Sequence, residues 1–142
     1  MKVKEVMTPR VIHISPEESA AVAARTLAHY NVGALPVCSV DGHLCGMLTD
    51  RDIVTRCLAS GSKPEDTTVR SIMTNTVVSV RPDMDTSAAA ALMARRQIRR
   101  LPVMENGSLC GMVSLGDLSH HEQTAPDAVD ALAEITGNVA EW

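Results

Sequence analysis

Aromatic side chains are almost absent from this sequence of 142 residues. It contains no phenylalanine, one tyrosine and one tryptophan, although 45% of its residues are hydrophobic. That hydrophobic content is ordinary for a globular protein and argues against a disordered chain. The core must therefore be built from Val, Ile, Leu, Met and Ala. Two halves of about 60 residues would each be marginal alone, so we expect them to share a core.

An excess of positive charge is also lacking. The formal net charge is −4 and the isoelectric point is about 5.7, which disfavours a nucleic-acid partner. No run approaches the roughly 18 apolar residues of a membrane span, and no signal-peptide pattern follows Met1. We therefore expect a cytoplasmic protein without a membrane partner. A local basic cluster is formed by Arg95, Arg96, Arg99 and Arg100.

The cysteines lack any pattern typical of a metal centre. Cys38, Cys45, Cys57 and Cys110 include no CxxC pair and no zinc-type spacing with the histidines. Most simply they are small buried hydrophobes. The alternative is a redox or metal role with Cys38 and Cys57 as partners. The pair His120–His121 is a weak candidate for metal binding. We interpret it as a solvated helix end and predict no metal site.

What the sequence does contain is an internal repeat. The same motifs occur twice in the same order, and their spacing shortens by one residue after LPV, where a hairpin loop tolerates it. The first copies are VMTPRVIHISP, VGALPV and GMLTDRDI, and the second are IMTNTVVSVRP, IRRLPV and GMVSLGDL. The match covers most of both halves, so we interpret the chain as a tandem repeat.

Each repeat predicts a strand, a helix, a strand, a tight turn, a strand and a closing helix. Asp41–Gly42 and Asn106–Gly107 are two-residue hairpin signals. A helix over 127–136 is predicted beyond the second repeat. The other predicted elements are strands at 11–14 and 77–80, helices at 20–30 and 87–97, strands beginning at 35–37 and 101–103, and strands at 44–48 and 109–113.

Each repeat places a hydroxyl and a carboxylate at the start of its closing helix. Thr49 precedes Asp52, and Ser114 precedes Asp117, at the spacing of a capping box. Capping alone would explain one copy. Two copies at equivalent strand ends indicate a ligand role, because a helix start favours anions and an Asp can accept hydrogen bonds from two vicinal hydroxyls. Together these features suit a phosphorylated ribose.

These motifs resemble the cystathionine-β-synthase (CBS) domain pair, or Bateman module, and the wording of GMLTDRDIV is similar to small stand-alone bacterial proteins of this kind. The resemblance covers about residues 3–120. It implies an α+β, α/β sandwich-like fold of two β-α-β-β-α repeats packed with pseudo-twofold symmetry, and a homodimer. We place the first repeat at 1–60, a linker at 61–68, the second repeat at 69–121 and a tail with a short helix at 122–142.

The resemblance also implies that adenine nucleotides or related adenosyl ligands bind in two clefts between the repeats. The favoured cleft is expected to use Ser114, Asp117, Thr8, Val11, Val32, Gly33 and Ala34, with phosphate contacts from Arg99 and Arg100. The second cleft is expected to use Thr49, Asp52, Thr74, Val77 and Ile98, with Arg99 beside it. The clefts differ because Asp50 and Arg51 replace the neutral Leu115 and Gly116. Asp50 would repel a phosphate in the second cleft, so we expect the favoured cleft to bind the ligand better.

The function indicated is therefore a non-catalytic regulatory module. It has no obligatory cofactor, senses AMP, ADP, ATP or S-adenosylmethionine, and acts through a homodimer or a regulated protein. No pair of nucleophile and base supports an enzyme. A redox- or metal-responsive protein that uses its cysteines and a ligand-free dimerisation module are the alternatives.

Overall fold

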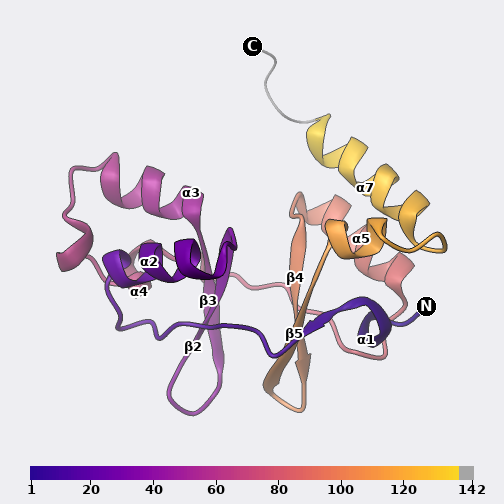
Figure 1. The fold of residues 1–142 in the computed structure, drawn as a ribbon, viewed down its shortest axis with the longest axis horizontal. Coiled ribbons are helices and arrows are strands. Elements are labelled where there is room, and N and C mark those ends of the chain that lie inside the picture. The colour runs from indigo at the N-terminus through magenta and orange to yellow at the C-terminus, as the bar shows by residue number, and fades with distance from the viewer. Residues whose placement is uncertain (138–142) are drawn as a thin grey trace. The chain divides into compact units, whose positions relative to one another are not determined.

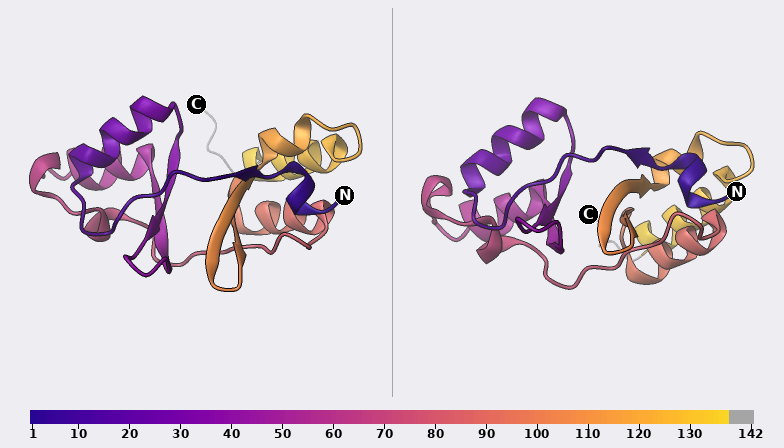
Figure 2. Two further views of the ribbon diagram at one scale, coloured as in Figure 1. Left: turned by 60° about the horizontal axis from the view of Figure 1, so that its bottom comes forward. Right: turned by 90° about the horizontal axis from the view of Figure 1, so that it is seen from below.

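The computed structural model describes residues 1–137, which form two compact units (Figures 1 and 2). The central unit is Ile12–Val77, and the terminal unit combines Met1–Val11 with the chain from Val78 onward. The boundaries of these units differ from those of the repeats, because the first eleven residues belong to the first repeat in sequence but pack with the second repeat. Figure 1 shows this indigo segment lying with α5 and β5 of the terminal unit.

The terminal unit packs helices around a three-stranded antiparallel sheet with the strand order β1-β5-β4. Pro102 lies in β4, an outer strand of this sheet, which is where a residue without an N–H is tolerated. The elements are α1 (Val3–Val6), β1 (Thr8–Pro9), α5 (Thr86–Arg96), β4 (Arg100–Glu105), β5 (Ser108–Ser114), α6 (Leu115–Ser119) and α7 (Ala125–Thr136).

The central unit is built on the antiparallel hairpin of β2 and β3. Its closing helix widens after one turn, since the Ala59 N–H donates to Val54 O five residues earlier. The elements are α2 (Ala20–Tyr30), β2 (Ala34–Cys38), β3 (Leu44–Thr49), α3 (Asp50–Asp52), the π-helix η1 (Ile53–Leu58), the 3₁₀-helix η2 (Pro64–Asp66) and α4 (Val69–Ile72).

The strands predicted at 11–14 and 77–80 are wrong. Each segment makes a single parallel bridge, Ile14 to Val37 and Val80 to Val103. The next N–H that a parallel ladder would need belongs to Pro16 in one segment and to Pro82 in the other. Because proline has no N–H, each pairing ends after one residue.

The two hairpins turn differently. Asn106 and Gly107 both have positive φ, 52° and 78°, so this two-residue turn is confirmed. The Asp41–Gly42 prediction is wrong in length. The Ser39 N–H donates to His43 O at 2.9 Å, and only Gly42 has a positive φ, so Val40 joins the loop and makes it three residues long.

Each unit has its own hydrophobic core of aliphatic side chains, in place of the shared core that we expected. Val3 and Val6 of the first repeat pack in the terminal core, and Val69 and Ile72 of the second repeat pack in the central core. Exchange of these short helices thus builds both cores from both repeats. The largest fully buried side chains include Leu35, Leu48, Met93, Leu101 and Leu118.

Replacement of Ser19 by alanine is expected to lower the free energy of unfolding by about 1 kcal/mol, because Ser19 Oγ accepts the Val22 N–H at the start of α2. Asp85 is the matched control, since its side chain accepts no N–H of α5 and instead accepts a hydrogen bond in an exposed ion pair with Lys2. Urea denaturation of both alanine variants measures the difference. Equal losses of unfolding free energy in the two variants would show that the hydrogen bond of the Ser19 cap does not stabilise the protein.

Candidate functional site

The two predicted hydroxyl–carboxylate pairs form matching capping boxes. Ser114 Oγ accepts the Asp117 N–H at 3.1 Å, and the Ser114 N–H donates to Asp117 Oδ2 at 2.8 Å. Thr49 and Asp52 make the same two bonds at 3.1 and 2.9 Å. Each aspartate therefore commits Oδ2 to the backbone. What Oδ1 meets decides how each pair can serve a ligand.

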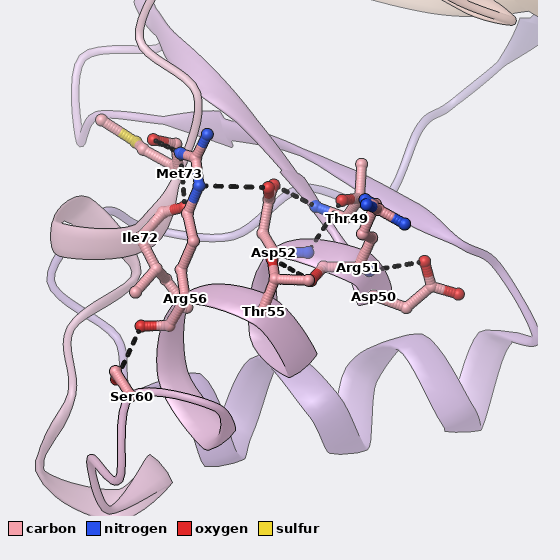
Figure 3. Close-up of polar contacts among 9 residues, drawn as sticks. All are labelled: Thr49, Asp50, Arg51, Asp52, Thr55, Arg56, Ser60, Ile72 and Met73. Atoms are coloured by element: carbon pink, nitrogen blue, oxygen red, sulfur yellow. Dashed lines mark hydrogen bonds and ion pairs between the residues drawn. The ribbon is translucent and has the colours of Figure 1, made fainter. Parts of the chain in front are cut away.

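In the central unit, Asp52 is tied into a polar network (Figure 3). Its Oδ1 lies 3.8 Å from Nε of Arg56, one helical turn along, and the residue is only 8% exposed. Arg56 Nη1 also donates to the carbonyl oxygens of Ile72 and Met73, both at 3.3 Å. Both carboxylate oxygens of Asp52 thus already face partners within the protein.

In the terminal unit, Asp117 lacks this restraint. The residue at the position that matches Arg56 is His121. Within residues 1–137, Asp117 forms no ion pair, and its only side-chain hydrogen bond is the capping bond through Oδ2. Asp117 is also half-buried, whereas Asp52 is buried. Its Oδ1 therefore has no hydrogen-bond or ion-pair partner among the described residues.

Basic residues lie beside Ser114 in the same unit. Arg100 pairs with Ser114 across β4 and β5, and the Leu115 N–H donates to Arg99 O at 3.0 Å. On the other side of β5, Thr8 follows Met7 and pairs with Met112. Neither Arg99 nor Arg100 forms an ion pair with a carboxylate in the described part of the chain. Positive charge without an internal partner thus adjoins the Ser114–Asp117 helix start.

The corresponding end of the central sheet is neutral at the positions before LPV. Ala34 pairs with Thr49, and the Asp50 N–H donates to Gly33 O at 3.1 Å. The exposed Asp50 carboxylate accepts the Arg51 N–H at 2.8 Å. Thr74 bridges to Met47 on the other side of β3. The two units therefore share a backbone plan and differ in charge.

The units regroup the residues predicted for the two clefts. Arg99 and Arg100 lie in the unit that holds Ser114. Thr8, Val11, Ile98 and Asp117 are also in the terminal unit, whereas Val32, Gly33, Ala34, Thr49, Asp52, Thr74 and Val77 are in the central unit. The contribution of Val32, Gly33 and Ala34 to a site with Ser114 stays a prediction.

Arg56 was not among the site residues predicted from the sequence. The signal was present, because an acid and a base four residues apart on a helix lie on the same face. The contacts of Arg56 with the Ile72 and Met73 carbonyls could not be predicted from the sequence, since they join residues 16 and 17 positions apart.

The sequence matches the CBS domain family model at residues 3–59 and again at 69–134. The chain therefore belongs to the CBS domain family. It carries two CBS repeats with an α+β fold, as predicted, and such a pair is a regulatory module.

Similar proteins agree with this membership. The CBS domain-containing protein YhcV of Bacillus subtilis is 42% identical over 134 residues, which is 94% of both chains. The structure resembles Hypoxic Response Protein I with two coordinated zinc ions, with a TM-score of 0.79 and 31% identity over 85% of this chain and 98% of that one. It also resembles the CBS domain pair of MJ0100 in complex with 5-methylthioadenosine and S-adenosyl-L-methionine, with a TM-score of 0.73 and 28% identity over 84% of this chain and 94% of that one.

Two features are not found in residues 1–137. None of the helices there is long and apolar enough to cross a membrane. No group of three or more His, Cys, Asp or Glu side chains gathers at a spacing that could hold a metal ion in that part of the chain.

Proposed function

We propose that this CBS pair is a non-catalytic sensor that binds an adenosyl ligand at the Ser114–Asp117 helix start. The observation that carries this proposal is the contrast between the two aspartates. Among residues 1–137 no side chain or backbone group contacts Oδ1 of Asp117 by a hydrogen bond or ion pair, whereas Asp52 faces Arg56. A ribose offers two vicinal hydroxyls, and a half-buried carboxylate oxygen is a strong acceptor for them.

The basic residues select the rest of the ligand. Arg99 and Arg100 adjoin the same helix start, and a guanidinium binds phosphate or carboxylate in a bidentate manner. An adenine nucleotide would offer its phosphates to them, and S-adenosylmethionine would offer its carboxylate. The complex of the MJ0100 pair with two adenosyl compounds supports this ligand class.

The regulatory output follows from differential affinity. A ligand shifts a conformational equilibrium only as far as its affinities for the two states differ. We propose that the chain acts in the cytoplasm as a homodimer that passes ligand occupancy to a regulated protein. A metal-responsive function is the runner-up, since Hypoxic Response Protein I holds zinc, but no ligand cluster in residues 1–137 argues for it.

The test is titration calorimetry of the full chain with AMP, ADP, ATP, S-adenosylmethionine, methylthioadenosine and zinc chloride. We expect saturable binding of at least one adenosyl compound at one molecule per chain, because Asp52 is engaged by Arg56. Methylthioadenosine has no anionic group and AMP carries a phosphate, so the affinity of AMP relative to that of methylthioadenosine measures what the arginines contribute to phosphate binding. Binding of zinc alone, or of nothing, would overturn the proposal.

A further inference from the structure

Two of the cysteines lie on neighbouring strands at an irregularity in the β2–β3 hairpin. Val37 pairs with Gly46 and Cys38 pairs with Leu44, so the register skips Cys45. Cys45 is therefore the extra residue of a β-bulge, and it lies between Leu44, which pairs with Cys38, and Gly46, which pairs with Val37. A disulfide needs Cβ atoms about 3.5–4.5 Å apart, so the bulge must shift to bring the two thiols together.

The two thiols differ in access. Cys38 is 5% exposed, whereas Cys45 is half-buried and its Sγ–H points at His43 O at 3.6 Å. Burial raises the pKa of the Cys38 thiol, and the nearby Cys45 raises this pKa further. Cys45 is thus the thiol that a reagent in solution reaches first, and Cys38 lies on the neighbouring strand.

The other two cysteines lack such a partner. Cys57 is fully buried, and its Sγ–H donates to Ser62 O at 3.7 Å and Thr67 Oγ1 at 3.6 Å. In the second hairpin Cys110 occupies the position of Cys45, but Met104 occupies that of Cys38 and pairs with Leu109. The second hairpin therefore serves as an internal control with the same bulge and one thiol.

We propose that Cys38 and Cys45 form a reversible intramolecular disulfide in response to a low-molecular-weight disulfide, as a redox input separate from the adenosyl site. The Cys45 thiolate attacks one sulfur of the small disulfide, forms a mixed disulfide and expels one thiolate. The Cys38 thiolate then attacks the Cys45 sulfur and expels the second thiolate. The two protons lost by the cysteines end on two molecules of small thiol, which are the reduced product.

This pair replaces Cys38 and Cys57 as the candidate redox pair. It resides entirely in the central unit, whereas the proposed adenosyl site uses Ser114 and Asp117 of the terminal unit. Disulfides of reducing compartments are typically transient and regulatory, which suits a hairpin that closes a bond without unfolding.

The test uses the full-length reduced chain, incubated with oxidised glutathione, quenched with N-ethylmaleimide and mapped by mass spectrometry. Trypsin leaves both cysteines on the peptide Thr26–Arg51, because no Lys or Arg lies between them. We expect this peptide to lose two hydrogen atoms and to carry no alkylated thiol, while Cys57 and Cys110 stay alkylated. A second digestion before Asp41 cuts the backbone between Cys38 and Cys45. The two resulting peptides should stay linked by the disulfide until a reductant is added.

Matched variants complete the test. Cys110→Ser should leave the disulfide unchanged, and Cys38→Ala should stop the reaction at a mixed disulfide on Cys45. Glutathione that persists on Cys45 of the unaltered chain, a Cys38–Cys57 bond, a Cys45 link to a second chain, or two alkylated thiols would each refute the proposal. The decisive reading comes from the unaltered chain, so it does not depend on whether a variant folds.

Discussion

Asp117→Asn is expected to remove the stabilisation that an adenosyl ligand confers on this protein. At a ligand concentration 100 times its dissociation constant, the unaltered chain should gain roughly 2.7 kcal/mol of folding free energy. The asparagine keeps a carbonyl oxygen for the Ser114 N–H, so the capping box should survive. It loses the anionic oxygen proposed to accept the ribose hydroxyls, so the rise in melting temperature with ligand should disappear.

The matched control is Asp52→Asn, which alters the equivalent capping box of the other unit. Because Arg56 already faces Asp52, we expect this variant to keep most of the ligand-induced stabilisation. Melting temperatures without ligand must be compared first, since they report the cost of each change to the fold. Equal loss of stabilisation in both variants would defeat the asymmetry between the sites. Full stabilisation in Asp117→Asn would remove Asp117 from the ligand.

Gly46→Ala is expected to lower the free energy of unfolding by about 1–3 kcal/mol. A Cβ on Gly46 would lie 2.6 Å from Thr74 O and 2.8 Å from Met73 Sδ. The methionine can shift, but Thr74 O accepts the Met47 N–H at 3.0 Å, so displacing this backbone breaks the contact with β3. Gly111→Ala should behave alike, with a Cβ 2.9 Å from Thr8 O.

Gly116→Ala is the control for these glycine changes. Its Cβ would meet nothing closer than Ser114 Oγ at 3.4 Å, and alanine favours the helix that Gly116 occupies. Urea denaturation should therefore separate Gly46→Ala and Gly111→Ala from Gly116→Ala. If all three shifted the midpoint equally, the close packing of the Thr74 and Thr8 backbone against β3 and β5 would not be what requires glycine at these positions.

Features that depend on neighbouring residues were predictable. The alanine-rich α2 begins at Ala20 and ends at Tyr30, where the sequence places it. The capping boxes at Thr49 and Ser114 and the Asn106–Gly107 turn also form as predicted. In each of these features the relevant hydrogen bonds or backbone angles join residues within four positions of one another, so the sequence states them directly.

Features that depend on distant parts of the chain were not. The segment Met1–Val11 packs in the terminal unit with the second repeat, and the segments 11–14 and 77–80 each make one bridge, to Val37 and to Val103.

The sequence by itself determined that the protein is a doubled CBS unit with two hydroxyl–carboxylate helix starts, because both properties are carried by repeated local motifs. Only the tertiary structure decided which of the two carboxylates faces an arginine and which cysteine lies beside Cys38. Asp52 faces an arginine that also donates to the Ile72 and Met73 carbonyls, and a bulge in the register places Cys45 next to the Cys38–Leu44 pair. Both outcomes depend on how separate segments pack, which motif spacing does not encode.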